Sequence, residues 1–186
     1  LIKYVIKKNN YKKYLEIGCH NNKIFDEIDI EKIGVDPISG GNFRGTSDKF
    51  FQENKLKFDC IFIDGLHEYN QVKRDIVNSI KILNTKGIII LHDCLPPSIN
   101  HQRVPRTRYR WNGDVWKAIV EARTWDYINT YTVLSDQGLG VIKKEKNSDI
   151  LNIPISSFKK LKYKFFYENY KKIMRTITYD KILEII

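Results

Sequence analysis

The sequence predicts an α/β fold with a mainly parallel sheet, an antiparallel hairpin at the C-terminal edge of that sheet, and a C-terminal helical extension. Three observations lead to this fold class. Short apolar runs end in Gly or Asp, an amphipathic segment separates two of these runs, and two β-rich runs flank a turn near residue 136. The 186 residues, 42% of them hydrophobic, are enough for one domain with a single substantial core.

Four short runs predict the strands of the sheet. Each is apolar and ends in a polar residue or glycine, as buried parallel strands do where they deliver polar groups to their carboxyl ends. The runs are "YLEIG" (14–18), "KIGVD" (32–36), "FDCIFIDG" (58–65) and "GIIILHD" (87–93).

Two helices and a hairpin complete the predicted domain. Residues 69–83 carry apolar side chains at spacings of four, four and three, which gives one apolar helical face, and residues 84–87 are predicted to end that helix. Asp114 is predicted to cap a second helix that runs to Arg123. Residues 128–134 and 139–144 flank a turn and predict a β-hairpin.

The last 30 residues interleave Lys with Phe and Tyr. We expect one or two helices packed on the core, with one helical side formed by Phe158, Leu161, Phe165 and Ile173. A partner helix or a membrane-surface helix is the alternative, which three acidic residues in this segment disfavour. Residues 1–150 are therefore predicted to form the main domain, and residues 151–186 an extension of the same domain.

The net charge of +10 is confined to the two ends of the chain. Residues 1–14 carry five lysines and no acid, and residues 151–186 carry a net charge of +5, which leaves the middle neutral. This distribution argues against a specific nucleic-acid partner. Three cysteines without metal-site spacing indicate a reduced, cytoplasmic protein, and no apolar run approaches the ~20 residues of a transmembrane segment. The sequence leaves the oligomeric state open, with a homo-oligomer among the options.

The polar residues at the strand ends should converge, because ligands of open α/β sheets bind beyond the carboxyl ends of the strands. These residues are Glu16, Gly18, Asp36, Asp64 and the pair His92–Asp93. Asp36 follows Glu16 by 20 residues, the separation at which an acid meets a ribose, and a carboxylate can accept from both ribose hydroxyls. Taken singly, each of these motifs is also compatible with a plain turn.

The loop after the first strand excludes a dinucleotide. A pyrophosphate needs a bare backbone, yet His20 and Lys23 stand where the dinucleotide fingerprint has its further glycines. A cationic ligand without phosphates suits a site with Glu16, Asp36 and Asp64. S-adenosylmethionine, with its ribose, adenine and sulfonium, is such a ligand.

With these motifs in order, the chain resembles the class I S-adenosylmethionine-dependent methyltransferases, which have a Rossmann-like fold. The resemblance covers about residues 12–144 and is greatest for the small-molecule and sugar O-methyltransferase-like branch, marked by Asp-Gly-x-His-x-Tyr and His-Asp. It implies that Glu16 and Gly18 line the methionine end of the cofactor and that Cys19 and His20 also belong to the cofactor-binding residues. It further implies that Asp36 holds the ribose, that Ser47 and Asp48 lie near the adenine, and that Asp64 faces the sulfonium. His20 and Asn22 depart from the small residues usual in this loop.

Two ways of activating an acceptor hydroxyl remain open. His67, three residues after Asp64, is a candidate general base. Alternatively, a divalent metal lowers the pKa of the hydroxyl. The resemblance implies Asp64, His92 and Asp93 as the catalytic group and as ligands for Mg²⁺ or Mn²⁺, although a histidine suits Mg²⁺ less well.

The loop between the fourth strand and the Asp114 helix is rich in arginine. Arg103, Arg106 and Arg108, with Trp111 as a platform, are predicted to bind an anionic acceptor such as a nucleotide-linked or phosphorylated sugar; a solvated loop is the alternative. The sequence thus predicts methylation of a sugar, a nucleotide-activated sugar or a related small molecule in glycan or natural-product biosynthesis. An RNA methyltransferase and a catalytically degenerate binding module are the competing hypotheses.

Overall fold

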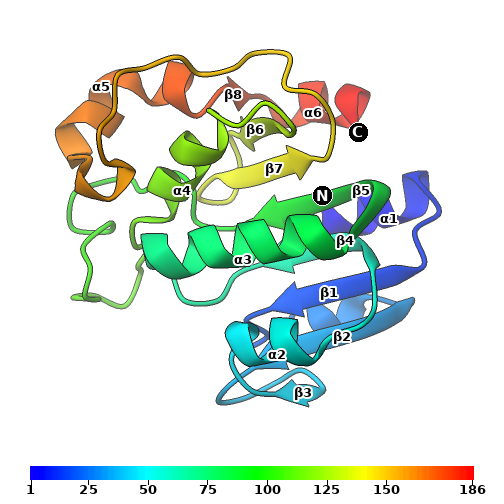
Figure 1. Ribbon diagram of the computed structural model, residues 1–186. Helices are drawn as coiled ribbons and strands as arrows, with labels where there is room; N and C mark the ends of the chain where they lie inside the picture. Colours follow the sequence, from blue (N-terminus) through cyan, green and yellow to red (C-terminus); the bar gives the residue numbers. More distant parts are fainter.

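The computed structural model describes residues 1–186, and a single sheet of eight strands forms its middle layer (Figure 1). The strand order is β3-β2-β1-β4-β5-β7-β6-β8, and β7 alone runs antiparallel to its neighbours. This confirms the predicted α/β fold with a mainly parallel sheet. The strands are β1 (Lys13–Ile17), β2 (Glu31–Asp36), β3 (Phe43–Arg44), β4 (Phe58–Ile63), β5 (Leu83–Leu91), β6 (Asn129–Val133), β7 (Leu139–Lys143) and β8 (Thr176–Ile177).

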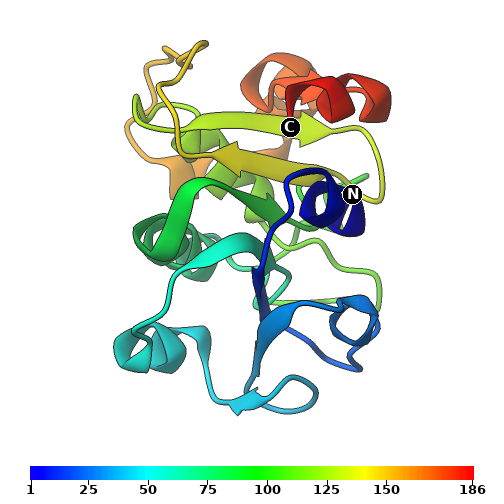
Figure 2. The same cartoon turned by 90° about the vertical axis from the view of Figure 1, so that its right-hand side faces the viewer.

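Helices cover both faces of the sheet, so the fold has three layers. Figure 2 shows α1 and α3 on opposite sides. Leu15 and Ile17 of β1 pack in the larger core cluster with α2, α3, α4 and α5, whereas Tyr14 packs with Val5 of α1 and Ile182 of α6. The helices are α1 (Ile2–Lys8), α2 (Ser47–Glu53), α3 (Tyr69–Ile82), α4 (Val115–Ala122), α5 (Tyr163–Ile173) and α6 (Tyr179–Ile185), with short 3₁₀ turns η1 (Phe25–Glu27) and η2 (Phe158–Lys160).

The strand order reverses at β1, which pairs with β2 on one side and β4 on the other. Three backbone bonds at the strand ends hold the tips of β2, β1, β4 and β5 in line. Gly18 N donates to Val35 O, Asp64 N to Ile17 O, and His92 N to Ile63 O, at 2.8, 2.8 and 3.1 Å. The polar residues that follow β1, β2, β4 and β5 therefore start from one edge of the sheet, where α/β proteins bind their ligands.

Several local predictions differ from the structure. Residues 84–87 do not form a turn after α3, because β5 begins directly at Leu83, and Lys86 takes a φ of +66° where the register against β4 is irregular. The hairpin of β6 and β7 forms as predicted, but β8 adds a further strand outside it. Asp114 occupies the N-cap position of α4 without a capping bond from its side chain.

The C-terminal extension packs on the core, and Phe158, Leu161, Phe165 and Ile173 all contact it as predicted, but they do not form one side of a single helix. Phe158 and Leu161 lie outside α5, and the residues of α5 that are buried are Phe166 and Ile173. The prediction was wrong because it continued one helical period across the break at Lys162, where the backbone is extended. At the other end of the chain, Lys8 Nζ donates to Leu183 O at 2.7 Å and ties α1 to α6.

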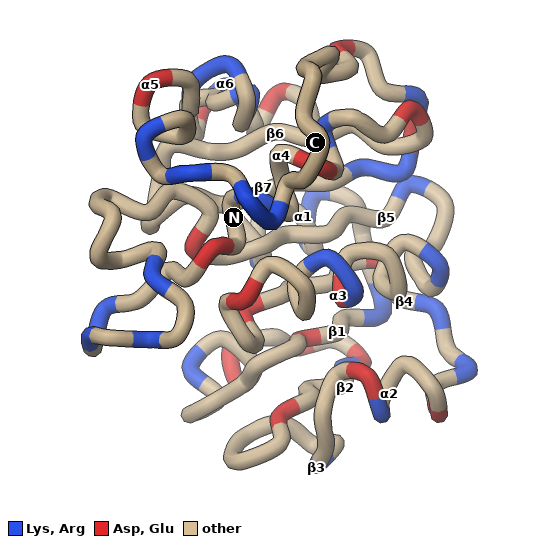
Figure 3. The backbone as a smooth tube through the Cα atoms, turned by 60° about the vertical axis from the view of Figure 1, so that its left-hand side comes forward, with Lys and Arg blue, Asp and Glu red and all other residues tan.

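The basic residues are spread over several elements, among them α3, α5 and α6 (Figure 3). All three cysteines are buried free thiols. None of the helices combines the length and the apolar character that spanning a membrane requires.

Candidate active site

The loop after β1 depends on a glycine at one position. Gly18 has a φ of +90°, and a Cβ there would lie 2.2 Å from Asp64 O, so only glycine fits between the tips of β1 and β4. His20 and Asn22 also adopt left-handed backbone, with φ of +46° and +61°. Asn22 Oδ1 accepts from Gly41 N at 2.6 Å, so an asparagine side chain fixes the loop in place of further glycines.

Glu16 lies at the end of β1 with only 2% of its surface exposed. The Tyr14 hydroxyl, two residues earlier on the same face, donates to Glu16 Oε2 at 2.6 Å. Burial raises the pKa of Glu16 to about 7, and nearby Asp64 adds to the rise while the Tyr14 bond opposes it. Cys19 is buried beside it, 3.8 Å from Glu16 O.

Asp36, at the end of β2, accepts three backbone hydrogen bonds. Its Oδ1 accepts from Ile38 N at 2.8 Å and Ser39 N at 2.9 Å, and its Oδ2 accepts from His20 N at 2.9 Å. Burial alone would raise the pKa of Asp36, but these bonds, with Arg44 nearby, hold it below its usual value. The carboxylate therefore joins the loop after β1 to the loop after β2.

Ser47 and Asp48 begin α2 and face α3. Gln71 Nε2 of α3 donates to Ser47 Oγ at 3.1 Å and to Asp48 Oδ1 at 3.2 Å, and Arg74 pairs with Asp48 at 3.3 Å. The Thr46 side chain caps α2 by accepting a hydrogen bond from Lys49 N. Both residues predicted to lie near the adenine are thus held by side chains of the neighbouring helix.

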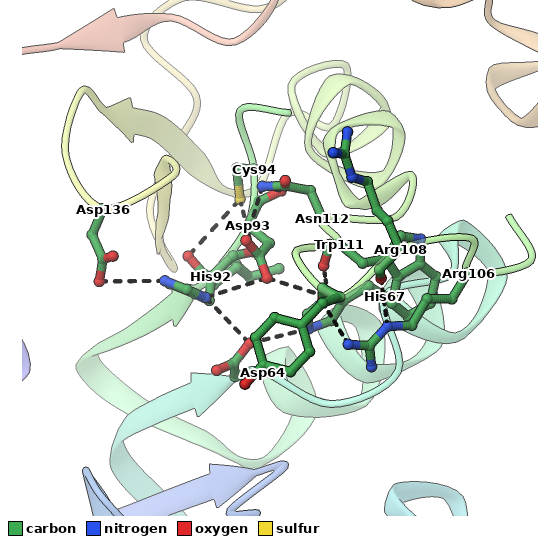
Figure 4. Close-up of polar contacts among 12 residues, drawn as sticks. Asp64, His67, His92, Asp93, Cys94, Arg106, Arg108, Trp111, Asn112 and Asp136 are labelled. Atoms are coloured by element: carbon green, nitrogen blue, oxygen red, sulfur yellow. Dashed lines mark hydrogen bonds and ion pairs between the residues drawn. The ribbon is translucent and has the colours of Figure 1, made fainter. Parts of the chain in front are cut away.

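Asp64, His67 and Asp93 meet beyond the tips of β4 and β5 (Figure 4). His67 Nε2 lies 3.1 Å from Asp64 Oδ1, and His67 Nδ1 lies 3.2 Å from Asp93 Oδ2 and 3.0 Å from Trp111 O. One ligand atom from each of the three residues falls within 4.8 Å of the others, a spacing at which one metal ion could be shared.

His92 contacts the same two carboxylates from the other side. Its Nδ1 lies 3.4 Å from both Asp64 Oδ1 and Asp93 Oδ2, and its Nε2 lies 3.3 Å from Asp136 Oδ2 in the turn between β6 and β7. The predicted trio of Asp64, His92 and Asp93 is therefore in contact, but the three residues spaced for a common ion include His67 instead of His92. The sequence adjacency of His92 and Asp93 suggested otherwise; the φ of +59° at Asp93 turns its side chain toward His67.

The pKa values of both imidazoles are raised above the ordinary value for histidine. Burial lowers the pKa of His92, but its contacts with Asp64 and Asp93 outweigh this and raise it to about 11. The contacts of His67 with Asp64 and Asp93 likewise raise its pKa above the ordinary value. In return, the two histidines lower the pKa of Asp64. The shared contacts with Asp64 and Asp93 thus favour the protonated form of both histidines at the centre of the site.

The arginine-rich loop reaches this centre through Trp111. The indole ring stacks on the His67 ring at 5.3 Å, and Trp111 Nε1 donates to Arg103 O at 2.5 Å. Arg106 bonds to carbonyls within the loop and lies 5.9 Å from the Trp111 ring. Arg103, Arg106, Arg108 and Arg110 are exposed, and none is among the arginines that pair with a carboxylate.

Four residues that sequence reasoning missed help to build the site. Asn112 Nδ2 donates to Asp93 Oδ1 at 2.8 Å, Tyr14 bonds Glu16, and Asp136 contacts His92. Gly113 has a φ of +59°, and a Cβ there would lie 1.7 Å from His67 O. The Asn-Gly dipeptide was a readable turn signal, whereas the contact of Asp136 follows only from placing the hairpin beside β5.

Comparisons with known proteins agree with this architecture. Residues 33–94 match a family model described as a methyltransferase domain, and no curated protein matches the chain. The SAH-bound methyltransferase PaMTH1 of Podospora anserina is similar in structure, with 14% identity, a TM-score of 0.60, and coverage of 78% of this chain and 76% of that one.

Two further solved structures are similar. The O-methyltransferase TomG of Streptomyces achromogenes, involved in tomaymycin synthesis and solved with SAM, has 8% identity, a TM-score of 0.61, and coverage of 77% of this chain and 78% of that one. CalS10 of Micromonospora echinaspora, an amino pentose methyltransferase involved in calicheamicin biosynthesis and bound to SAM, has 11% identity, a TM-score of 0.52, and coverage of 76% and 87%.

The match over residues 33–94 and the fold both support the predicted S-adenosylmethionine-dependent methyltransferase. The predictions of a Rossmann-like fold and of this enzyme class are thereby confirmed.

Proposed function

We propose that this protein transfers the methyl group of S-adenosylmethionine to a hydroxyl of a small molecule, a sugar or nucleotide-activated sugar being the favoured acceptor. The observation that carries the proposal is the gathering of Glu16, Asp36, Asp64, His67 and Asp93 at the strand-order reversal. Carboxylates on three strand tips suit a cationic cofactor, and the cluster beside them suits proton removal from an acceptor.

The loop geometry supports the cofactor assignment. Gly18 leaves bare backbone at the tip of β1, and Glu16, when ionised, offers a negative charge beside it. Asp36 keeps unused lone pairs on Oδ2, which accepts only from His20 N and can also accept from a ribose hydroxyl. S-adenosylmethionine supplies the electrophilic methyl group, and Asp64 lies where it can face the sulfonium.

The cluster also bears on how the acceptor is deprotonated. The raised pKa of His67 favours its charged form, which must lose a proton to Asp64, Asp93 or solvent before His67 can act as a base. A divalent cation on Asp64, His67 and Asp93 would replace that proton and lower the pKa of a bound hydroxyl. The mixed donor set suits Mn²⁺ better than Mg²⁺. We therefore favour metal-assisted deprotonation and keep His67 as the alternative base.

The arginine-rich loop supports an anionic acceptor. The Arg106 guanidinium lies 5.9 Å from the ring of Trp111, which stacks on His67, and none of the four loop arginines pairs with a carboxylate. The loop is electropositive enough to affect His101, whose pKa is lowered by burial and then by Arg108 and Arg110. Exposed guanidinium groups such as those of Arg103 and Arg108 suit the phosphate or carboxylate of an anionic acceptor.

Steady-state kinetics with matched acceptors test this function. Formation of S-adenosylhomocysteine should be measured with phosphorylated and nucleotide-linked sugars and with the corresponding neutral sugars. Arg103→Gln/Arg108→Gln should raise KM for the anionic acceptors about tenfold or more with little change in kcat. The control Lys55→Gln/Lys57→Gln removes the same charge from exposed positions elsewhere. It should change neither KM nor kcat. Equal turnover of neutral and anionic sugars would rule out a preference for an anionic acceptor.

The two competing hypotheses make different predictions in the same assay. An RNA methyltransferase would turn over RNA and none of the sugars. A degenerate binding module would bind S-adenosylhomocysteine and methylate nothing; the left-handed His20 and Asn22 in the cofactor loop are the feature that favours it.

A further inference from the structure

A cavity of about 400 Å³ lies away from the candidate active site. It is formed by the end of α4, residues 149–152, the end of α5 and Thr176 of β8. Arg175 in its wall bonds Asn129, which begins β6, whereas the candidate active site adjoins the turn that follows β6. The two sites are thus at opposite ends of this strand.

A buried arginine with unmet hydrogen bonds lines this cavity. Arg123 is 2% exposed, and its Nη2 donates to Asp149 Oδ2 at 3.1 Å. Its Nε and Nη1 have no acceptor in the protein. Leaving charged N–H groups buried without partners is costly, so this guanidinium is under-neutralised.

A second guanidinium shares the same carboxylate. Arg175 Nε lies 3.4 Å from Asp149 Oδ2, and the side chain is held by Asn129, Ser148 and the ring of Tyr131, 4.2 Å from the guanidinium carbon. Asp149 is itself half-exposed, with 54% of its side chain accessible. One exposed carboxylate therefore serves two well-fixed arginines.

Lys171 and Lys172 add two more cations to the cavity wall. Both are exposed on the last turn of α5, and the charges lining the cavity sum to +3. Attraction to the helix C-terminus accounts for basic residues in a last turn. Arg123 is likewise the C-cap residue of α4, but attraction to a helix end leaves its buried Nε and Nη1 groups without an acceptor.

We propose that this cavity binds a ligand through a phosphate group. A phosphate at neutral pH brings the negative charge that the two arginines and two lysines lack, and its oxygens match a guanidinium fork and lysine donors. The walls are fixed in advance, since Asn147 Nδ2 and Leu151 N both donate to Arg123 O. The cavity volume leaves room for a small group esterified to the phosphate.

Calorimetry and NMR with inorganic pyrophosphate test the proposal on the full chain. Pyrophosphate should bind and shift the amide signals of Leu151 and Thr176. Lys171→Ser/Lys172→Ser should weaken binding about tenfold or more. The control Lys159→Ser/Lys160→Ser makes the same charge change outside the cavity and should have little effect. Arg123→Gln should abolish the amide shifts, provided that its spectrum is that of a folded protein.

The other outcomes overturn the proposal. Equal weakening in the two lysine pairs would mean that pyrophosphate responds only to overall charge. Weakening confined to Arg103→Gln/Arg108→Gln would place the anion at the arginine-rich loop. No binding at low millimolar pyrophosphate would mean that the cavity holds no phosphate site. None of these results depends on methyltransferase activity.

Discussion

Asp36→Asn is the most informative single substitution in the cofactor site. An asparagine oxygen can still accept from Ile38 N and Ser39 N, but its amide nitrogen would then face His20 N, donor against donor. Losing one charge-assisted bond and leaving a poorly solvated N–H without a partner should cost about 1–3 kcal/mol of unfolding free energy. For a chain of this size that corresponds to a fall in Tm of about 2–4 °C per kcal/mol.

The same substitution should weaken binding of S-adenosylhomocysteine, by about 5- to 150-fold if the ribose bonds and the loop position contribute 1–3 kcal/mol together. Calorimetry and thermal unfolding measure the two effects, and Asp29→Asn, at an exposed position, is the matched control. Because the folded pKa of Asp36 is lowered, its stabilisation is present above the unfolded pKa and is lost as pH falls through the folded value. The wild type and Asp36→Asn should therefore become equally stable at acid pH. Unchanged stability and unchanged affinity at pH 7 would refute the reasoning.

Three further predictions follow from the site. If a cation activates the acceptor, EDTA should abolish turnover, Mn²⁺ should restore it, and Asp93→Asn should be nearly inactive; full activity in EDTA with a 10²–10⁴-fold loss in His67→Ala would assign the base to His67 instead. The folded pKa of Glu16 is raised to about 7, so the unfolded chain releases this proton at a lower pH than the folded protein does. The wild type should therefore lose up to about 3 kcal/mol of unfolding free energy relative to Glu16→Gln as pH rises from 4.5 to 7. Urea unfolding measures this, and parallel pH profiles of the two proteins would contradict it. RNA binding should be weak and fall steeply with salt, whereas tight, sequence-selective binding at physiological salt would favour an RNA substrate.

The sheet was predictable because its interior strands carry their signal locally. Continuous apolar runs ending in Gly or Asp marked β1, β2, β4 and β5, and alternation with a helix implied parallel pairing. Edge elements such as β3 and β8 have two residues each, too few for a pattern, and their pairing depends on long-range contacts. The start of β5 was missed because a turn-like sequence was overridden by pairing with β4.

The candidate site was predictable in its location but not in its connections. Strand ends placed Glu16, Asp36 and Asp64 at one edge, since topology alone brings them there. The contact of His67 with Asp93 and with Trp111 O involves the backbone turn at Asp93 and the loop that carries Trp111, neither of which has a periodic signal. The contact of Asp136 with His92 joins residues 44 positions apart, and it follows from the position of the hairpin beside β5.

The central claim is that the strand tips around Gly18 form a cofactor site for S-adenosylmethionine. An NMR titration of the ¹⁵N-labelled protein with S-adenosylhomocysteine tests it most directly. We predict saturable shifts of the Gly18, His20 and Asp64 amide signals, with no change at Leu151, which lines the cavity beside Arg123. Absence of these shifts at millimolar ligand, or shifts confined to other parts of the chain, would contradict the account.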